Sequence, residues 1–175
     1  RNTVMSTDGS STMAIRISSA LLVVLVLLAA CGPEPEHQEA VVKKPDLAAL
    51  ADDEVQFAIL DYAHAKMAGR YDQEAAILAT MPAGVRALYV VSGVEDEVNN
   101  GGFNQYYWNS TRKFADDAVA AFEYFSAHEH AELMQEANRI HAAEQAEIAK
   151  FKAQGTLQAF SDSYKVSKLG PLDER

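Results

Sequence analysis

The sequence predicts an all-α protein in which one compact helical domain follows an export signal and a flexible tether. Apolar residues recur at helical spacing through most of the chain after residue 52. Asp, Ser and Thr stand where several of these stretches begin, as helix caps do. No alternating strand pair or hairpin pattern interrupts them. A length of 175 residues is suited to one domain with appendages rather than to two full domains.

The first thirty residues predict an export signal. Residues 1–12 are interpreted as an upstream extension, since a start at Met13 gives a short cationic beginning with Arg16. An unbroken apolar run follows at 20–30, and eleven residues are too few for a bilayer core that takes about twenty. A cationic start, a short apolar run and small residues before a junction are typical of a signal peptide, here 13–30.

The junction after this run centres on the sole cysteine, Cys31, which excludes an intramolecular disulfide. The run Leu28-Ala29-Ala30-Cys31-Gly32 resembles the bacterial lipobox. This resemblance implies that Cys31 becomes a lipidated N-terminus and attaches the protein to a membrane. Gly32 in place of Asp after the cysteine implies, by the same resemblance, the outer membrane facing the periplasm.

Residues 31–46 are predicted to form the lipidated cysteine and a disordered tether, because Pro and Glu dominate there without apolar periodicity. The chain is acidic, with 15 Lys and Arg against 25 Asp and Glu, a formal net charge of −10. This balance argues against direct nucleic-acid binding, which needs cations to replace phosphate counterions. It also predicts repulsion from anionic lipid headgroups, so the anchor is the expected membrane contact.

The predicted all-α domain spans 47–175 and begins with a helix that Asp52 or Asp53 caps and Gly69 ends. A short apolar helix at 75–81 stops at Pro82. The segment 83–98 contains the β-prone run 88–91, and we still expect a helix because its neighbours are helical.

Two later helices are expected from periodicity and caps. Thr111 is predicted to cap a helix with an apolar face that ends near Phe125. Ser126 and Glu129 match the capping box and predict the start of a long helix that ends before Gly155. On this helix His128, His130 and His141 are expected to be solvated. His130 and His141 are three turns, roughly 16 Å, apart, and the His128–Glu132 pair has no third ligand nearby, so no metal or other cofactor is predicted.

The run 95–110 carries the most information, because turn-forming residues meet aromatic ones there. Asn99-Asn100-Gly101-Gly102 is typical of a tight corner. Phe103, Tyr106 and Tyr107 follow at helical spacing. One interpretation is a corner whose aromatic residues pin the next helix to the core. The other is a polar binding corner beside aromatic surface. The candidate binding residues are Glu97, Asn100, Gly101, Gly102, Phe103, Gln105 and Tyr106.

The same run, Val98-Asn99-Asn100-Gly101-Gly102-Phe103-Asn104-Gln105-Tyr106-Tyr107, resembles the signature of a bacterial all-helical family named after a DNA-mimic protein. The similarity extends from about residue 52 to the C-terminus. It implies an all-α fold and an interaction role, in which acidic side chains are shown to a DNA-binding protein. It implies no catalytic residues.

Three functions are therefore open. The first is a lipid-anchored, non-enzymatic interaction domain that binds a basic protein partner in the cell envelope. The second is an envelope ligand-binding protein or hydrolase that uses the corner of Glu97, Asn100 and Gln105. The third is a DNA mimic that binds a DNA-binding protein. No Ser-His-Asp pattern, phosphate-binding glycine loop or HExxH motif appears, so we predict no enzymatic activity.

Overall fold

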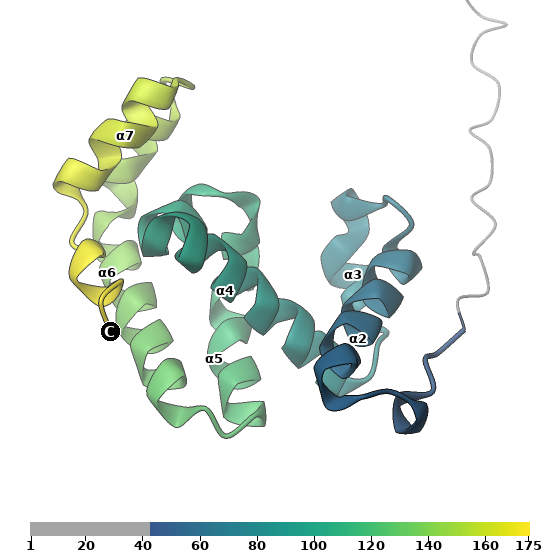
Figure 1. Ribbon diagram of the computed structural model, residues 1–175. Coiled ribbons are helices and arrows are strands. Elements are labelled where there is room, and N and C mark those ends of the chain that lie inside the picture. Colours follow the sequence, from purple (N-terminus) through teal and green to yellow (C-terminus); the bar gives the residue numbers. More distant parts are fainter. Residues whose placement is uncertain (1–42) are drawn as a thin grey trace, which may run out of the picture. The chain divides into compact units, whose positions relative to one another are not determined.

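A computed structural model describes residues 43–175, and the predicted signal peptide and Cys31 lie outside this range (Figure 1). The described residues contain helices and no strand, which confirms the predicted all-α class. The elements in chain order are η1 (Leu47–Ala49), α2 (Asp52–Met67), η2 (Tyr71–Gln73), α3 (Glu74–Ala79), α4 (Ala83–Trp108), η3 (Ser110–Phe114), α5 (Ala115–Tyr124), α6 (His128–Lys152), α7 (Leu157–Val166) and η4 (Gly170–Leu172).

The helix α4 lies at the centre of the domain. It packs against α2 on one side and α5 on the other, α5 packs against α6, and α6 against α7 (Figure 1). The run 88–91 lies inside α4, as expected, and its Val90 and Val91 are buried. Apolar and aromatic side chains from α2 to η4 form one contiguous core.

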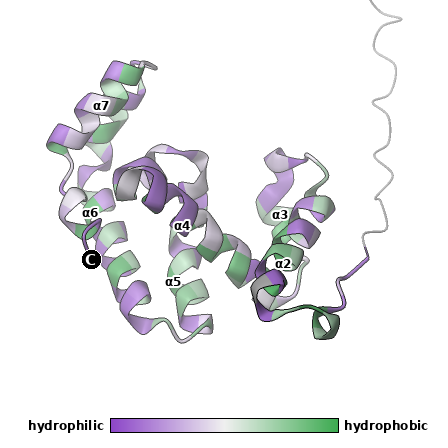
Figure 2. Cartoon of the chain, in the orientation of Figure 1, coloured by the Kyte–Doolittle hydropathy of each residue, from purple (hydrophilic) through white to green (hydrophobic). Residues whose placement is uncertain are grey.

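The hydropathy of the residues that α4 contributes to the core changes along the helix. Its first half carries hydrophobic residues, whereas its second half is coloured mainly as hydrophilic in Figure 2. The second half is nevertheless deeply buried, because Tyr106 and Tyr107 are only 0% and 2% exposed. Tyrosine provides a large apolar ring with one polar atom, so a buried helix can contain it without a high hydropathy.

The C-terminal segment returns to the core after α7. Glu144 on α6 accepts hydrogen bonds from the Ser167 hydroxyl at 3.0 Å and the Lys168 backbone amide at 2.8 Å. Leu169 and Leu172 are buried beyond this point. Because the carboxylate holds the chain where α7 ends, the last residues are directed back onto α4, which η4 contacts.

Three of the predicted helix caps are wrong. Ala51 precedes α2, and the Glu54 carboxylate accepts from its amide at 3.1 Å, so neither Asp52 nor Asp53 is the N-cap residue. Ser126 has a φ of 59° and Ala127 is the N-cap of α6, without a side-chain cap. Thr111 lies inside η3 rather than before it. The cap of α2 lies one residue before Asp52 and that of α6 one residue after Ser126, so the pattern placed these two starts to within one residue but not the capping residue itself.

Candidate functional site

The predicted corner is a kink within α4, at Gly101 and Gly102. Gly102 has φ 72° and ψ −179°, a region that essentially only glycine occupies. A Cβ at this position would lie 2.3 Å from the Asp173 carboxylate, so a side chain would also have no room. The corner is therefore confirmed, and the helix restarts at Phe103 in a new direction.

Glu97, on the first half of α4, holds the two sides of the kink together. Its Oε2 accepts from Gln105 Nε2 at 2.8 Å and from Asn109 Nδ2 at 2.7 Å. Its Oε1 accepts from the Thr111 hydroxyl at 3.0 Å. Both carboxylate oxygens are thus used within the chain, and hydrogen bonds to a charged acceptor are the stronger kind.

Asp173, near the C-terminus, holds the restarted helix from outside. Its Oδ1 accepts from the Phe103 backbone amide at 2.8 Å, across seventy residues of sequence. A carboxylate at the start of a helical segment is stabilised by the free amides and by the helix dipole. Asp173 therefore does for the second half of α4 what an N-cap residue does elsewhere.

The aromatic residues after the kink are packing residues. Phe103 and Tyr106 are 4% and 0% exposed. Tyr107 donates its hydroxyl to Asn138 Oδ1 on α6 at 2.6 Å, and burial raises the pKa of this phenol. Burial likewise raises the pKa of Tyr106, whose hydroxyl has no partner in the described part of the chain. The structure thus supports the packing interpretation for these rings.

The candidate binding residues are close together but do not form an open site. Gly102, Phe103 and Tyr106 are buried, while Glu97 and Gln105 bond to each other. The Gly101 carbonyl accepts from the Tyr164 hydroxyl on α7 at 2.7 Å. Asn100 is the exposed member of the set. The corner is a joint between α4, η3, α7 and the C-terminal segment.

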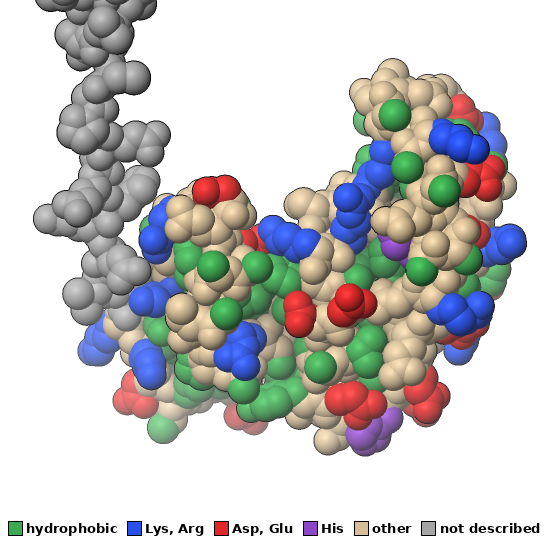
Figure 3. All heavy atoms as spheres, turned by 180° about the vertical axis from the view of Figure 1, so that it is seen from behind, with side chains coloured by type: hydrophobic (Ala, Val, Ile, Leu, Met, Phe, Trp, Pro, Cys, Tyr) green, Lys and Arg blue, Asp and Glu red, His purple; other side chains and the backbone are tan. Residues whose placement is uncertain are grey.

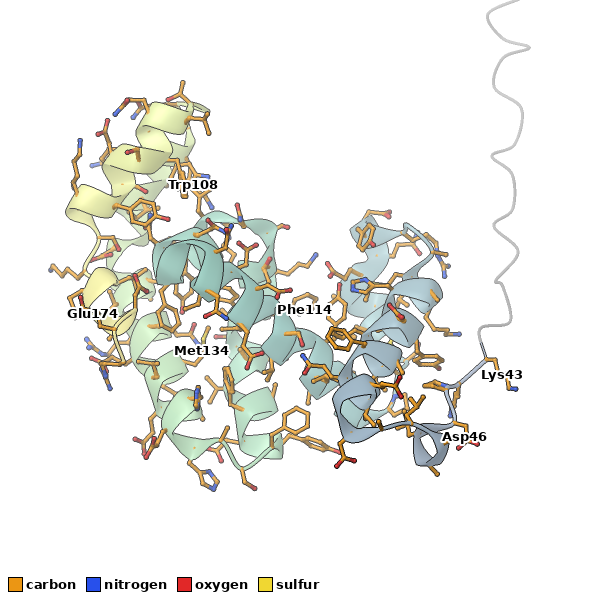
Figure 4. All side chains as sticks on the ribbon, in the orientation of Figure 1. Lys43, Asp46, Trp108, Phe114, Met134 and Glu174 are labelled. Atoms are coloured by element: carbon orange, nitrogen blue, oxygen red, sulfur yellow. The ribbon has the colours of Figure 1, made fainter. Side chains whose placement is uncertain are left out.

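A groove lies beside this joint, between α4, the start of α6 and the C-terminal segment. It has a volume of about 330 Å³. Its base is apolar and includes Phe103, Leu133 and Met134; Met134 is labelled on α6 in Figure 4. Of the predicted residues, Phe103 alone lines this groove, so the spacing of the motif did not reveal it.

The rim of the groove is predominantly acidic. Glu95 and Glu129 are exposed there, together with Asp173. The one Arg of the lining, Arg175, is paired with Glu136 at 2.6 Å. Figure 3 shows that acidic side chains also lie among hydrophobic ones on the back face of the molecule. The groove thus joins apolar surface to uncompensated negative charge.

The three histidines of α6 have separate environments, and the expected solvation is wrong for His141, which is half-buried. His128 contacts Glu123 at 2.7 Å, His130 stacks on Phe122, and His141 stacks on Tyr107 with ring centroids 4.2 Å apart. Desolvation, then the charges of Arg112 and Lys152, lower the pKa of His141. Within residues 43–175 no three His, Cys, Asp or Glu side chains are grouped to hold a metal ion.

Two cations lie at the C-terminal end of α4. Lys152 Nζ and Arg112 Nη1 both donate to the Tyr107 carbonyl, at 3.2 and 3.4 Å. Burial, and then the nearby Arg112 charge, lower the pKa of Lys152 to about 8. Lys152 also lies 5.4 Å from the centre of the Trp108 ring. These cations complement the negative end of the helix, so we assign them a structural role.

Among the helices of the described part, none is both long and apolar enough to cross a bilayer. Neither a curated protein nor a solved structure matches the chain. Residues 79–175 match the family described as DMP19-like protein. This match covers more than half of the chain and includes the α4 kink, the groove and the C-terminal segment. The chain belongs to the DMP19-like protein family.

Proposed function

We propose that this protein is a lipid-anchored, non-enzymatic interaction domain whose groove binds a basic segment of a partner protein. The observation that carries the proposal is the groove of about 330 Å³ with an apolar base and an acidic rim. A DNA-mimic-like helical interaction domain is also what membership of the family suggests.

Charge complementarity supports a basic occupant. Glu95 and Glu129 project from the rim without a cationic partner in the part of the chain described. The net charge of −10 attracts a basic segment over a distance and raises its rate of encounter. The apolar base then favours a segment that carries a hydrophobic anchor side chain, because buried hydrophobic contact supplies most of the affinity.

The second function, a ligand-binding protein or hydrolase that uses the predicted corner, has less support. Glu97 would have to act as a ligand or a general acid or base, yet its two oxygens accept three internal hydrogen bonds. A catalytic carboxylate needs a free oxygen within reach of the substrate proton. Because Glu97 is bonded internally in this way, the corner supports catalysis less well than the neighbouring groove supports binding.

A helical peptide with lysines on one face and a leucine on the other tests the groove. We expect the E95Q/E129Q variant to bind this peptide at least about fivefold more weakly than the wild type, since fivefold is about 1 kcal/mol. The control is D61N/E147Q, which removes the same charge from exposed positions outside the groove lining. Equal weakening by both variants would show that only the overall charge attracts the peptide.

The anchor is tested by the intact mass of protein extracted from membranes. We expect a product that begins at Cys31 and carries added acyl mass, because at least two chains are needed for stable attachment. A C31S variant should retain the signal peptide and lose the acyl mass. An unacylated, uncleaved wild-type protein would contradict the proposed envelope location and its outer-membrane placement.

A DNA-binding protein is the second candidate partner, favoured by the family match. It would present a basic surface to the same acidic rim. In this case duplex DNA should compete with the domain for the partner, because the DNA phosphates and the acidic rim would bind the same Lys and Arg side chains of that partner. If DNA competes and the chain is also not cleaved before Cys31, this candidate is favoured over the envelope partner.

A further inference from the structure

A second, smaller pocket lies between α2, α4 and η3, and it shares no residue with the acidic groove. Its volume is about 170 Å³, room for about five water molecules. Phe114, labelled in Figure 4, forms part of its wall. The pocket is thus the size of a small polar molecule and independent of the proposed interaction surface.

Ser92 in this pocket has an unmet hydrogen-bonding requirement. The residue is 6% exposed, and its hydroxyl has no hydrogen-bond partner within residues 43–175. A buried hydroxyl without a partner destabilises the fold, whereas an alanine at the same place would not. The position therefore carries a polar group that the packing of the domain does not use.

The charged groups of the pocket are mainly acidic. Glu74 accepts from the Tyr89 hydroxyl and pairs with Lys113, so its charge is compensated. Asp96 is exposed at the pocket and forms no hydrogen bond or ion pair among the described residues. One uncompensated carboxylate is thus left beside the free Ser92 hydroxyl.

Three aromatic rings complete the wall. His64 and Tyr89 meet edge to face with centroids 5.4 Å apart, and Tyr89 and Phe114 do so at 6.3 Å. The negative faces of aromatic rings attract cations, and more strongly where water is excluded. Lys113 Nζ already lies 5.3 Å from the centre of the Phe114 ring, so His64 and Tyr89 are the rings left for a ligand. A carboxylate, these two rings and a free hydroxyl together are the acceptor set that suits an organic ammonium group.

We propose that this pocket binds a small primary amine, with its ammonium group at Asp96 and the rings and a hydrogen bond to the Ser92 hydroxyl. An anion would be repelled by the uncompensated charge of Asp96. A neutral molecule would leave the Asp96 charge without a partner. The proposal rests on residues outside the groove, so it stands whether or not the groove binds a basic protein segment.

The probe is 1,4-diaminobutane, with 1,4-butanediol as its neutral isostere, followed by NMR at constant ionic strength. We expect the diamine to bind with a Kd of about 1 mM or below, and to shift the amides of Ser92, Gly93 and Thr111 selectively. The diol should not shift them. Shifts spread over all acidic surfaces, or equal shifts with the diol, would overturn the proposal.

Two variants make the test specific. D96N should weaken diamine binding at least fivefold, while E147Q, an equal change in charge at an exposed site outside the pocket lining, should leave it unchanged. S92A should raise the unfolding midpoint of the empty protein and weaken binding. A stabilised S92A variant with unaltered affinity would show that the hydroxyl serves no ligand and would overturn the assignment.

Discussion

At the scale of single residues, several polar side chains of the predicted corner form hydrogen bonds with other parts of the chain and are not free to bind a ligand. Glu97 shows this most clearly, since it receives donors from the second half of α4, from the residue after α4 and from η3. The three donors lie 8, 12 and 14 residues after Glu97 in the sequence. A carboxylate in a motif with amides and a hydroxyl is therefore evidence for a joint as much as for a binding site.

The Glu97 joint gives a prediction about stability. We expect Glu97→Ala to lower the free energy of unfolding by about 2 kcal/mol, because it removes charge-assisted hydrogen bonds and leaves their donors without an acceptor. Glu97→Gln should cost less, since its amide oxygen still accepts. Urea denaturation measures both variants.

The matched control is Glu147→Ala, at an exposed position of α6. A surface substitution of this kind is expected to change the stability by less than about 0.5 kcal/mol. If Glu97→Ala were as mild as this control, the three hydrogen bonds would not hold the kink.

At the scale of the element, α4 consists of two helical segments joined by glycines. The first segment packs against α2 and α5, and the second is capped by Asp173. Gly102 is required both for its positive φ and for the close approach of that carboxylate. An uninterrupted helix could not bring Phe103 under η4 and Glu97 against Asn109 at the same time.

Gly102→Ala should therefore destabilise the domain by about 3 kcal/mol, from backbone strain and from overlap with Asp173. Gly155→Ala is the control, because Gly155 also has a positive φ of 63° but nothing within 4 Å of a Cβ. We expect about 1 kcal/mol there. Thermal or urea unfolding compares the two variants.

The double variant G102A/D173A separates overlap from strain. Removing the carboxylate relieves the overlap, so the double variant should be less destabilised than the sum of the two single variants. Additive losses would mean that Asp173 moves aside at no cost and that φ alone explains the glycine.

At the scale of the whole molecule, the contact between α4 and α6 couples stability to pH, because the His141 ring of α6 is stacked on the Tyr107 ring of α4. His141 has a lowered pKa in the fold, chiefly because burial disfavours its charged form. Arg112 and Lys152 add repulsion, Glu144 opposes the shift, and the Tyr107 ring covers one face of the imidazole. The unfolded chain therefore binds more protons at this residue than the folded one, so stability falls as pH drops below about 6.5.

We expect the wild type to lose stability between pH 7.5 and 5.5, measured by urea denaturation at both values. His141→Phe keeps a ring on Tyr107 but cannot be protonated, so it should reduce this loss. His128→Gln, at an exposed histidine, is the control and should not. A loss as large in His141→Phe as in the wild type would assign the pH dependence to other groups.

The sequence predicted the helices whose amphipathic pattern is strong, and it missed what non-local contacts decide. The α7 helix was not predicted, although Thr156 caps it by accepting from the Ala159 amide at 3.1 Å. Thr156 stands directly before the apolar residues of this helix, and a threonine in that position is a typical N-cap that could have indicated the helix. The predicted cap at Ser126 failed because that residue adopts a positive φ between α5 and α6.

The sequence by itself determined the helical class, the family signature and the corner at Gly101 and Gly102. These depend on local periodicity and on the backbone freedom of glycine, which nearby residues fix. Only the tertiary structure decided that the Glu97 carboxylate is bonded internally and that Asp173 caps the helical segment beyond the kink. It also decided that the groove is lined by residues that, apart from Phe103, are not among the predicted binding residues. The partners of these carboxylates lie up to seventy residues away, and a one-dimensional pattern contains no information on which distant donors the fold brings within hydrogen-bonding distance.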